Sequence, residues 1–294
     1  MTAAGPRLAA VYVALFAFAG LHLPFWPVWL ASKGLDAVEI GMLIATGRWV
    51  VIAASPLIAQ LADRSGERRR PMIILAAGML GGYALFFAFD TFWGFLLATV
   101  VVAFFQGSMI PLNESLTLRN VDEGRVDYGR VRLWGSLSFI VATIAGGMLL
   151  EGRPEQVILW AILAAVALIL IVAVTLPDTR IAPAKLRLTA FLRLATHPTF
   201  ALFLIAIALL QGSHTVVYAY GSLHWRAAGI SPTLIGWLWA EGVIAEIVLF
   251  MFAAAVTRRL GVGGLLALAT AAGVLRWLVL GATVEPAGLM LIQP

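Results

Sequence analysis

The segment AQLADRSGERR, residues 59–69, separates two long apolar runs of the chain. It places Asp63 and Gly66 among three arginines, Arg64, Arg68 and Arg69. Arginines alone are typical of a cytoplasmic loop between two membrane spans. Such a loop does not require an acid and a glycine at this spacing. The segment therefore indicates a short charged turn that does more than orient the two spans.

The composition of the 294-residue chain is too apolar for a soluble domain. Hydrophobic residues make up 62% of the chain and charged residues only 12%, against about 45–50% and about 25% in soluble domains. The 20 Lys and Arg residues fall in short clusters between apolar runs, which excludes the basic face of a nucleic-acid binder. There is no cysteine, so disulfides and thiolate metal sites are excluded. We expect an all-α polytopic membrane protein that is embedded in the lipid bilayer.

Nine apolar runs are long enough to cross about 30 Å of hydrocarbon as helices. None shows the alternation of a strand. The first is too long and ends too bulkily for a signal peptide, so we interpret it as an uncleaved span. The nine predicted spans are residues 8–30, 39–61, 72–90, 92–117, 130–150, 156–176, 199–223, 233–256 and 263–283. A tenth apolar segment, residues 286–294, is cut off by the end of the sequence.

The basic residues predict the orientation of the chain in the membrane. Fifteen Lys and Arg residues lie at the N-terminus and in every second loop after it, and three lie in the opposite loops. This bias predicts a cytoplasmic N-terminus. The longest loop carries Pro177, Pro183 and Pro198 and separates six spans from the rest. We therefore predict an N-terminal six-helix half (1–176), a cytoplasmic linker (177–198) and an incomplete C-terminal half (199–294).

An internal repeat links the second and eighth spans. Residues 34–66 and 229–261 align without a gap, with ten identities over 33 positions, four of them glycines. Glycine in a membrane helix marks close approach of two backbones. Two halves in the same orientation form the parallel-repeat plan of major facilitator transporters. Two such units span about 390 residues, so we expect a truncated second repeat, with nine full spans plus part of a tenth, that does not transport on its own.

Residues 59–69 resemble the major facilitator loop motif G-x-x-x-D-[RK]-x-G-x-[RK]-[RK], with Ala59 in place of the first glycine. The segments at 24–30 and 128–136 are similar to those of proton-coupled sugar symporters related to lactose permease. The resemblance to the bacterial 3-phenylpropionic acid transporter branch is stronger and runs over essentially the whole chain. It is carried by DYGRVRLWGS (127–136), LQGSH (210–214), WRAAG (225–229), GWLW (236–239) and VLRW (274–277).

This resemblance implies a secondary active transporter that works by alternating access. It implies proton symport of a small organic solute, most simply an aromatic carboxylic acid such as a phenylpropionate-like compound. It also implies a monomer in the bacterial inner membrane, driven by the proton gradient with no other cofactor. In the family, the residues that match Asp63, Arg64, Gly66, Arg68 and Arg69 act as a conformational switch.

Charged side chains inside the predicted spans are candidates for function, because each costs about 2.5–3.5 kcal/mol at mid-membrane. Arg48 and Arg276 are candidate substrate ligands, and Glu241 and Glu246 are candidates for proton coupling. Glu246 and Arg276 lie at similar depth on consecutive spans and are expected to be able to pair, with a purely structural ion pair as the alternative.

Glu114 and Arg132 are 18 residues apart, as are the glutamate and arginine that hold substrate in lactose permease-like symporters. The alternative is that Glu114 only caps its span in the headgroup region. Residues Gln211, His214, Thr215, Tyr218 and Ser222 form one polar stripe on an apolar span, which lipid does not favour. Asn113 belongs to a weaker stripe. From these stripes Asn113, Gln211, His214 and Tyr218 are candidates to line a wet cavity, with a helix interface as the alternative.

Other functions remain open at this point. A sugar or a nucleoside is an alternative substrate. A sensor that binds ligand without translocating it belongs to another functional class, as does a membrane-embedded lipid-modifying enzyme. The enzyme needs a nucleophile or a His/Asp pair at the interface, and none is visible, so we expect no enzymatic activity and no bound metal.

Overall fold

The computed structural model describes residues 4–176 and 196–293, which consist of helices joined by turns. Nine helical segments within these ranges are long and apolar enough to cross a membrane, as predicted. The predicted linker, except for its last three residues, lies outside the described residues. The helices are α1 (Ala4–Ser32), α2 (Ala37–Ser65), α3 (Arg69–Ala84), η1 (Leu85–Phe87), α4 (Phe92–Gln106), α5 (Met109–Asp122), α6 (Tyr128–Leu150), α7 (Gln156–Thr175), α9 (Pro198–Val216), η2 (Val217–Gly221), α10 (Ser222–Ala227), α11 (Pro232–Ala282) and α12 (Pro286–Ile292).

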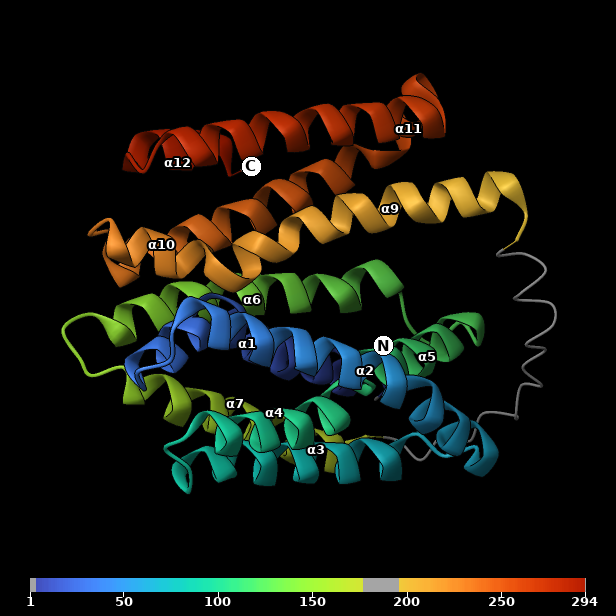
Figure 1. The fold of residues 1–294 in the computed structure, drawn as a ribbon. Coiled ribbons are helices and arrows are strands. Elements are labelled where there is room, and N and C mark those ends of the chain that lie inside the picture. Colours follow the sequence, from blue (N-terminus) through green and yellow to red (C-terminus); the bar gives the residue numbers. More distant parts are fainter. Residues whose placement is uncertain (1–3, 177–195, 294) are drawn as a thin grey trace.

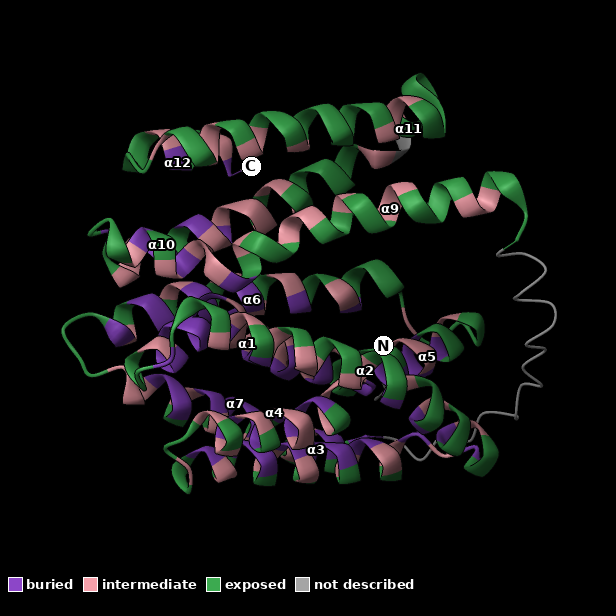
Figure 2. Cartoon of the chain, in the orientation of Figure 1, coloured by how far each residue is buried: buried purple, intermediate pink, exposed green. Residues whose placement is uncertain are grey.

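The helices form two groups that run roughly side by side (Figure 1). In the first group, α1 packs on α6 and α7, α3 packs on α4 and α7, and α2 packs on α4. The second group consists of α9 to α12 and meets the first mainly where α11 packs on α6. Buried positions are concentrated on α1 to α7 (Figure 2), whereas α9 has no buried residue. The hydrophobic core therefore lies mostly within the N-terminal half.

The repeat predicted at an offset of 195 is visible in the backbone. Gly34 and Gly229 both have a left-handed conformation, with φ of 85° and 82°. Two residues later, Asp36 and Ser231 are the N-caps of α2 and α11, and each side chain accepts a hydrogen bond from the backbone N–H three residues on. Only glycine adopts positive φ freely, so the repeated glycine sets the same sharp entry into both helices.

Three helices are interrupted where the sequence predicted continuous spans. The fourth span bends at a turn over residues 107–108, between α4 and α5. The seventh span contains a π-helical turn, η2. α11 covers two predicted spans and changes direction at Gly261, whose φ of 62° lies outside the helical region. A left-handed glycine ends one helix and starts the next without a long loop.

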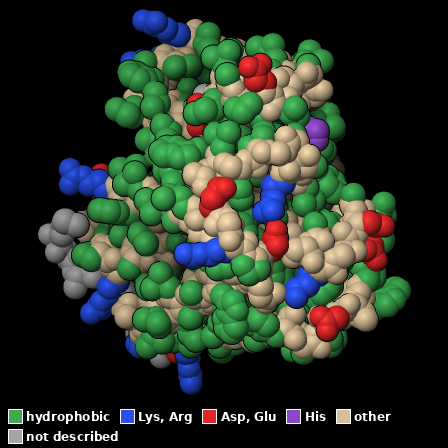
Figure 3. Space-filling model, turned by 90° about the vertical axis from the view of Figure 1, so that its left-hand side faces the viewer, with side chains coloured by type: hydrophobic (Ala, Val, Ile, Leu, Met, Phe, Trp, Pro, Cys, Tyr) green, Lys and Arg blue, Asp and Glu red, His purple; other side chains and the backbone are tan. Residues whose placement is uncertain are grey.

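The two halves meet at one end of the bundle, which carries the loops 33–36, 151–155 and 228–231 and is called the closed end below. α6 and α11 approach closely there: a Cβ on Gly147 would lie 2.3 Å from the Pro232 carbonyl oxygen, and one on Gly236 would lie 2.4 Å from the Thr143 carbonyl oxygen. Figure 3 looks onto this end and shows acidic and basic side chains close together among hydrophobic ones.

Polar bonds reinforce the closed end. Arg226 on α10 forms an ion pair with Glu155 over 2.9 Å. Glu151 accepts hydrogen bonds from the backbone N–H and the hydroxyl of Thr233, over 3.2 Å and 2.8 Å. Thr233 lies in the first turn of α11, where a carboxylate also interacts favourably with the helix dipole. The two halves are therefore held together at this end by both packing and charge.

Candidate functional site

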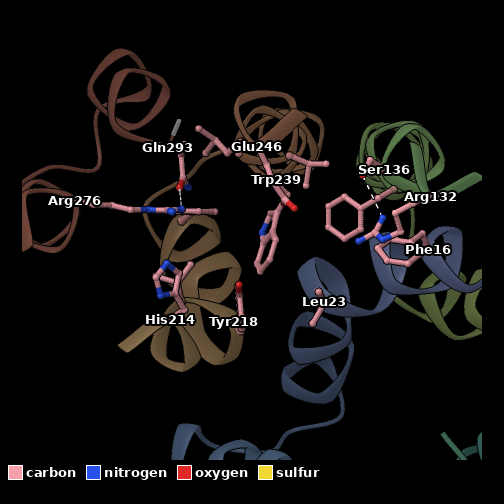
Figure 4. Close-up of a pocket in the computed structure, with 16 residues that line it drawn as sticks. Phe16, Leu23, Arg132, Ser136, His214, Tyr218, Trp239, Glu246, Arg276 and Gln293 are labelled. Atoms are coloured by element: carbon pink, nitrogen blue, oxygen red, sulfur yellow. Dashed lines mark hydrogen bonds between the residues drawn. The ribbon is translucent and has the colours of Figure 1, made fainter. Parts of the chain in front are cut away.

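A cavity of about 350 Å³ lies between the two halves. α1 and α6 of the first half line one side of it, and α9, α11 and α12 of the second half line the other (Figure 4). The cavity is large enough for a small organic ligand. The lining residues are Phe16, Leu23, Arg132, Ser136, Phe139, His214, Val217, Tyr218, Trp225, Leu238, Trp239, Gly242, Val243, Glu246, Arg276 and Gln293.

Arg132 reaches this cavity from the first turns of α6. Its guanidinium lies over the Phe16 ring, 4.1 Å from the centroid, and 5.9 Å from the centroid of Tyr12. It donates a long hydrogen bond of 3.4 Å to the Ser136 hydroxyl, one turn along the helix. Stacking on an aromatic face holds a guanidinium in place while most of its N–H groups stay available. Arg132 is thus oriented but has donors left for a ligand.

Glu114 does not pair directly with Arg132, in contrast to the family pattern that its spacing suggested. The Tyr128 side chain lies close enough to interact with both, and Glu114 also lies beside Tyr12. Glu114 does not line the cavity between the halves. The bend between α4 and α5 gives a physical reason, because residues on α5 no longer continue the helical faces of α4.

Asn113, a predicted cavity residue, is instead fully buried within the N-terminal half. Neither polar atom of its amide has a hydrogen-bond partner among the described residues. It shares the buried face of α5 with Thr117 and Asn120, which donate to backbone carbonyls on the same helix. Of the two interpretations of the weaker polar stripe, the structure agrees with the helix interface.

Arg276 approaches the cavity from the opposite half, on the second part of α11. It donates a short hydrogen bond to the side-chain oxygen of Gln293, as Figure 4 shows. The neighbouring Trp277 donates over 3.1 Å to the Ser213 hydroxyl and meets the His214 ring edge-on, with 5.0 Å between the centroids. These contacts connect α11 to α9 and fix the depth at which the Arg276 guanidinium lies.

Glu246 lines the same cavity as Arg276, but the two side chains form no ion pair in the described residues. The predicted pairing is therefore absent here, because Gln293 of α12 occupies the Arg276 guanidinium. Glu246 is the one carboxylate among the residues that line this cavity. Glu241 does not line it. That side chain is partly buried, and one of its carboxylate oxygens has no hydrogen-bond partner among the described residues.

The polar stripe predicted on the seventh span is divided by the π-helical turn η2. His214 and Tyr218 line the cavity as predicted, whereas Gln211 and Thr215 do not. Ser222 is buried and accepts a hydrogen bond of 3.0 Å from the Trp239 indole N–H. A turn with one extra residue shifts the helical phase of everything that follows it, and so the five residues do not share one face.

The charged turn at residues 59–69 joins α2 to α3 at the opposite end of the bundle from the closed end. Arg68 is buried, pairs with Asp63 over 2.5 Å and donates over 2.8 Å to the Ala62 carbonyl. Gly66 adopts a left-handed conformation, φ 67°, and ends α2. Arg64 is exposed and Arg69 half-buried. The acid and the glycine therefore have distinct structural tasks, as their spacing indicated.

Three residues of the cavity were missed by the sequence: Phe16, Trp239 and Gln293. Phe16 carries Arg132, Gln293 binds Arg276, and Trp239 stacks on Tyr218 with 5.7 Å between the centroids. An aromatic residue in an apolar span carries no signal of its own. Gln293 has one, as a polar residue in the last apolar segment. Arg48 lies in a separate cavity, lined chiefly by the N-terminal half.

Known proteins resemble the chain over nearly its whole length. The MFS_1 like family matches residues 6–293. The "Probable 3-phenylpropionic acid transporter" of Escherichia coli is 31% identical, over 97% of this chain and 76% of that protein. The maltose permease of Geobacillus stearothermophilus is 33% identical, over 92% of this chain and 69% of that protein. The crystal structure of the nucleoside transporter NupG superposes with a TM-score of 0.79 at 17% identity, over 99% of this chain and 77% of that one.

The solved structure shows the fold, and the family match together with the sequence relatives identifies the class of protein. The helical architecture, the repeat and the charged turn agree with that class. The chain therefore belongs to the MFS_1 like family and is a membrane transporter of the major facilitator type, not an enzyme.

Proposed function

We propose that the protein is a proton symporter for a small aromatic carboxylate. The observation that carries this proposal is the charge of the cavity between the halves. Arg132 and Arg276 enter it from opposite halves, and Glu246 is the one acidic residue that lines it. Two guanidinium groups against one carboxylate favour an anionic ligand, and each arginine can hold a carboxylate by two parallel hydrogen bonds.

The remaining walls suit a flat apolar body. Phe16, Trp225 and Trp239 line the cavity together with aliphatic side chains. Aromatic rings in such a cavity accept another ring in offset or edge-on contacts. The name of the Escherichia coli relative points to the same class of ligand. The maltose permease and the nucleoside transporter leave a sugar or a nucleoside as the alternative.

Alternating access follows from the two ends of the bundle. We propose that the arginine-rich end, with the turn 59–69, faces the cytoplasm, in agreement with the distribution of basic residues. The closed end then faces the outside, and this conformation is inward-facing. Transport requires that the α6–α11 contact opens while the cytoplasmic ends of the two halves come together.

Proton coupling needs a carboxylate that exchanges its proton as the cavity changes sides. Glu246 is our first candidate, because it faces the same space as both arginines. Protonation of Glu246 removes the one negative charge from the lining and so favours binding of an anion. Glu241 is the second candidate, five residues earlier on α11.

The test uses the full-length protein in proteoliposomes with labelled 3-phenylpropionate. We expect uptake driven by an inward proton gradient, counterflow in the absence of a gradient, and competition by other aromatic carboxylates. Glu246→Gln should retain counterflow and lose gradient-driven accumulation, and Glu241→Gln is the matched comparison. Competition by maltose or uridine but not by aromatic acids would overturn the substrate class. Binding without counterflow would identify a sensor.

A further inference from the structure

A second cavity lies on the other side of α1 from the first. It has a volume of about 390 Å³ and is lined by α1 to α5 together with one residue of the second half, Tyr218. Tyr218 and Leu23 line both cavities and so lie between them. Because almost its whole wall belongs to the N-terminal half, this cavity does not depend on how the two halves meet.

Arg48 is the one charged residue among those that line the second cavity. Among the described residues it has neither a hydrogen-bond partner nor an ion-pair partner. It lies about 16 Å from the start of α2, at 1.5 Å per residue, and so well inside the span. A guanidinium at that depth is costly unless something binds it. A ligand with one negative charge would provide the missing partner.

The wall opposite is aromatic. The rings of Phe18, His22 and Trp26 are stacked along α1, with successive centroids 5.2 Å and 5.7 Å apart. Tyr83 of α3 meets the Trp26 ring edge-on at 5.5 Å, and Phe86 meets it edge-on at 4.8 Å. Rings held in this way leave faces and edges for contact with a further flat ring.

The polar groups of this cavity are few and neutral. The Thr99 hydroxyl is buried and has no hydrogen-bond partner among the described residues. The Tyr83 hydroxyl donates a long bond of 3.4 Å to Gln106. A sugar needs many hydrogen-bonding partners, and a cation needs an acidic group, which this lining lacks. A dianion would leave one charge without a counter-charge.

We infer that the second cavity is a binding site for an aromatic monocarboxylate, whose carboxylate binds Arg48 and whose ring lies against Trp26 and Tyr83. This site is additional to the one between the halves, and it needs no transport step. It relies on the proposed function only for the choice of ligand used to test it.

The test counts bound ligands by equilibrium dialysis of the full-length protein with labelled 3-phenylpropionate. We expect two molecules per protein, and one in either Arg48→Gln or Arg132→Gln. Arg130→Gln, an exposed arginine that lines neither cavity, is the matched control and should keep both. Arg48→Lys should weaken one site about 10-fold, because lysine keeps the charge but loses the paired hydrogen bonds. 3-Phenylpropanol, which has the ring without the carboxylate, should not compete.

The outcomes separate this inference from the proposed function. If one ligand binds to the parent and is lost in Arg48→Gln but kept in Arg132→Gln, the second cavity is a site and the proposed site between the halves is wrong. If Arg48→Gln binds as many molecules as the parent with unchanged affinity, the inference is overturned while the proposed function stands. Absence of binding to the parent overturns both.

A second measurement uses the unsubstituted protein and so does not depend on how Arg48→Gln folds. Photolabelling with 4-azidobenzoate should modify peptides of α1 and α3 that contain Trp26 and Tyr83, and 3-phenylpropionate should protect them. Adducts confined to α6, α9 and α11 would overturn the inference. Labelling of both sets of peptides agrees with two sites.

Discussion

The closed end and the arginine-rich end of the bundle use their charged side chains in opposite ways. At the closed end, Glu151 and Glu155 of the first half bind residues of the second half. At the arginine-rich end, Asp63 binds Arg68 and Glu123 binds Arg119, each within the first half. Charge therefore joins the halves at one end and stiffens a single half at the other.

This difference shows which contacts define the present conformation. Bonds within one half can persist in every state of an alternating-access cycle, whereas bonds between halves must break once per cycle. The close approach of α6 and α11 and the bonds of Glu151 and Glu155 belong to the second kind. Substitutions at the closed end should therefore change the balance between states, and those at the arginine-rich end should change how readily one half moves.

The largest effect is expected at Gly236, where α11 touches the backbone of α6. Gly236→Val places a Cβ about where 2.4 Å separates it from the Thr143 carbonyl oxygen, so the helices must separate. Overpacking costs about 1–3 kcal/mol, which lowers the population of this state roughly 5- to 150-fold. Cross-linking between Glu151→Cys and Thr233→Cys measures it directly, because the chain has no cysteine of its own.

Gly281→Val is the matched control, since a Cβ on Gly281 meets no atom within 4 Å. It should cross-link like the parent. An unchanged cross-linking yield in Gly236→Val would show that α6 and α11 do not limit closure. Uptake by the full-length protein should fall in parallel with the yield.

The sequence predicted the spans, the repeat and the charged turn because each depends on local pattern. Membrane helices are set by hydropathy, and Gly34 and Gly229 mark the same turn in both copies. The cost of intramembrane charge also identified Arg132 and Arg276 correctly as lining one cavity. Rotation about a helix axis was not predictable, so Asn113 and Gln211 were placed in a cavity that they do not line.

The next effect in size concerns Arg132. Arg132→Lys should weaken binding of 3-phenylpropionate about 10-fold or more, because loss of one charge-assisted hydrogen bond costs about 1.5–3 kcal/mol. Lysine also cannot replace the flat guanidinium that lies on Phe16. Yield and melting temperature should stay near those of the parent. Arg130→Lys, about 200° around the helix, is the control, and equal binding by both variants would contradict a ligand role for Arg132.

A smaller effect is expected at Asp63 in the arginine-rich end. Asp63→Asn keeps an oxygen that can accept from Arg68 but loses the charge. The difference between a charged and a neutral hydrogen bond is about 1 kcal/mol, or roughly fivefold in an equilibrium. Transport should slow by about that factor while ligand affinity stays unchanged, because the turn lies outside both cavities. Asp122→Asn, an exposed acid that ends α5, is the control. Equal losses of transport and binding would instead indicate misfolding.

The smallest effect is expected for the ion pair of Glu155 and Arg226. Both side chains are partly exposed, at 31% each, and ion pairs of this kind contribute about 0.2–1 kcal/mol. Glu155→Gln should therefore lower the 151–233 cross-linking yield by less than about fivefold. The loss should disappear in high salt, because an accessible pair is screened over about 3 Å at 1 M. A double-mutant cycle with Arg226→Gln measures the coupling free energy between the two side chains. A loss that persists in high salt would mean that Glu155 acts through packing rather than charge, and the closed end would then depend on α6 and α11 alone.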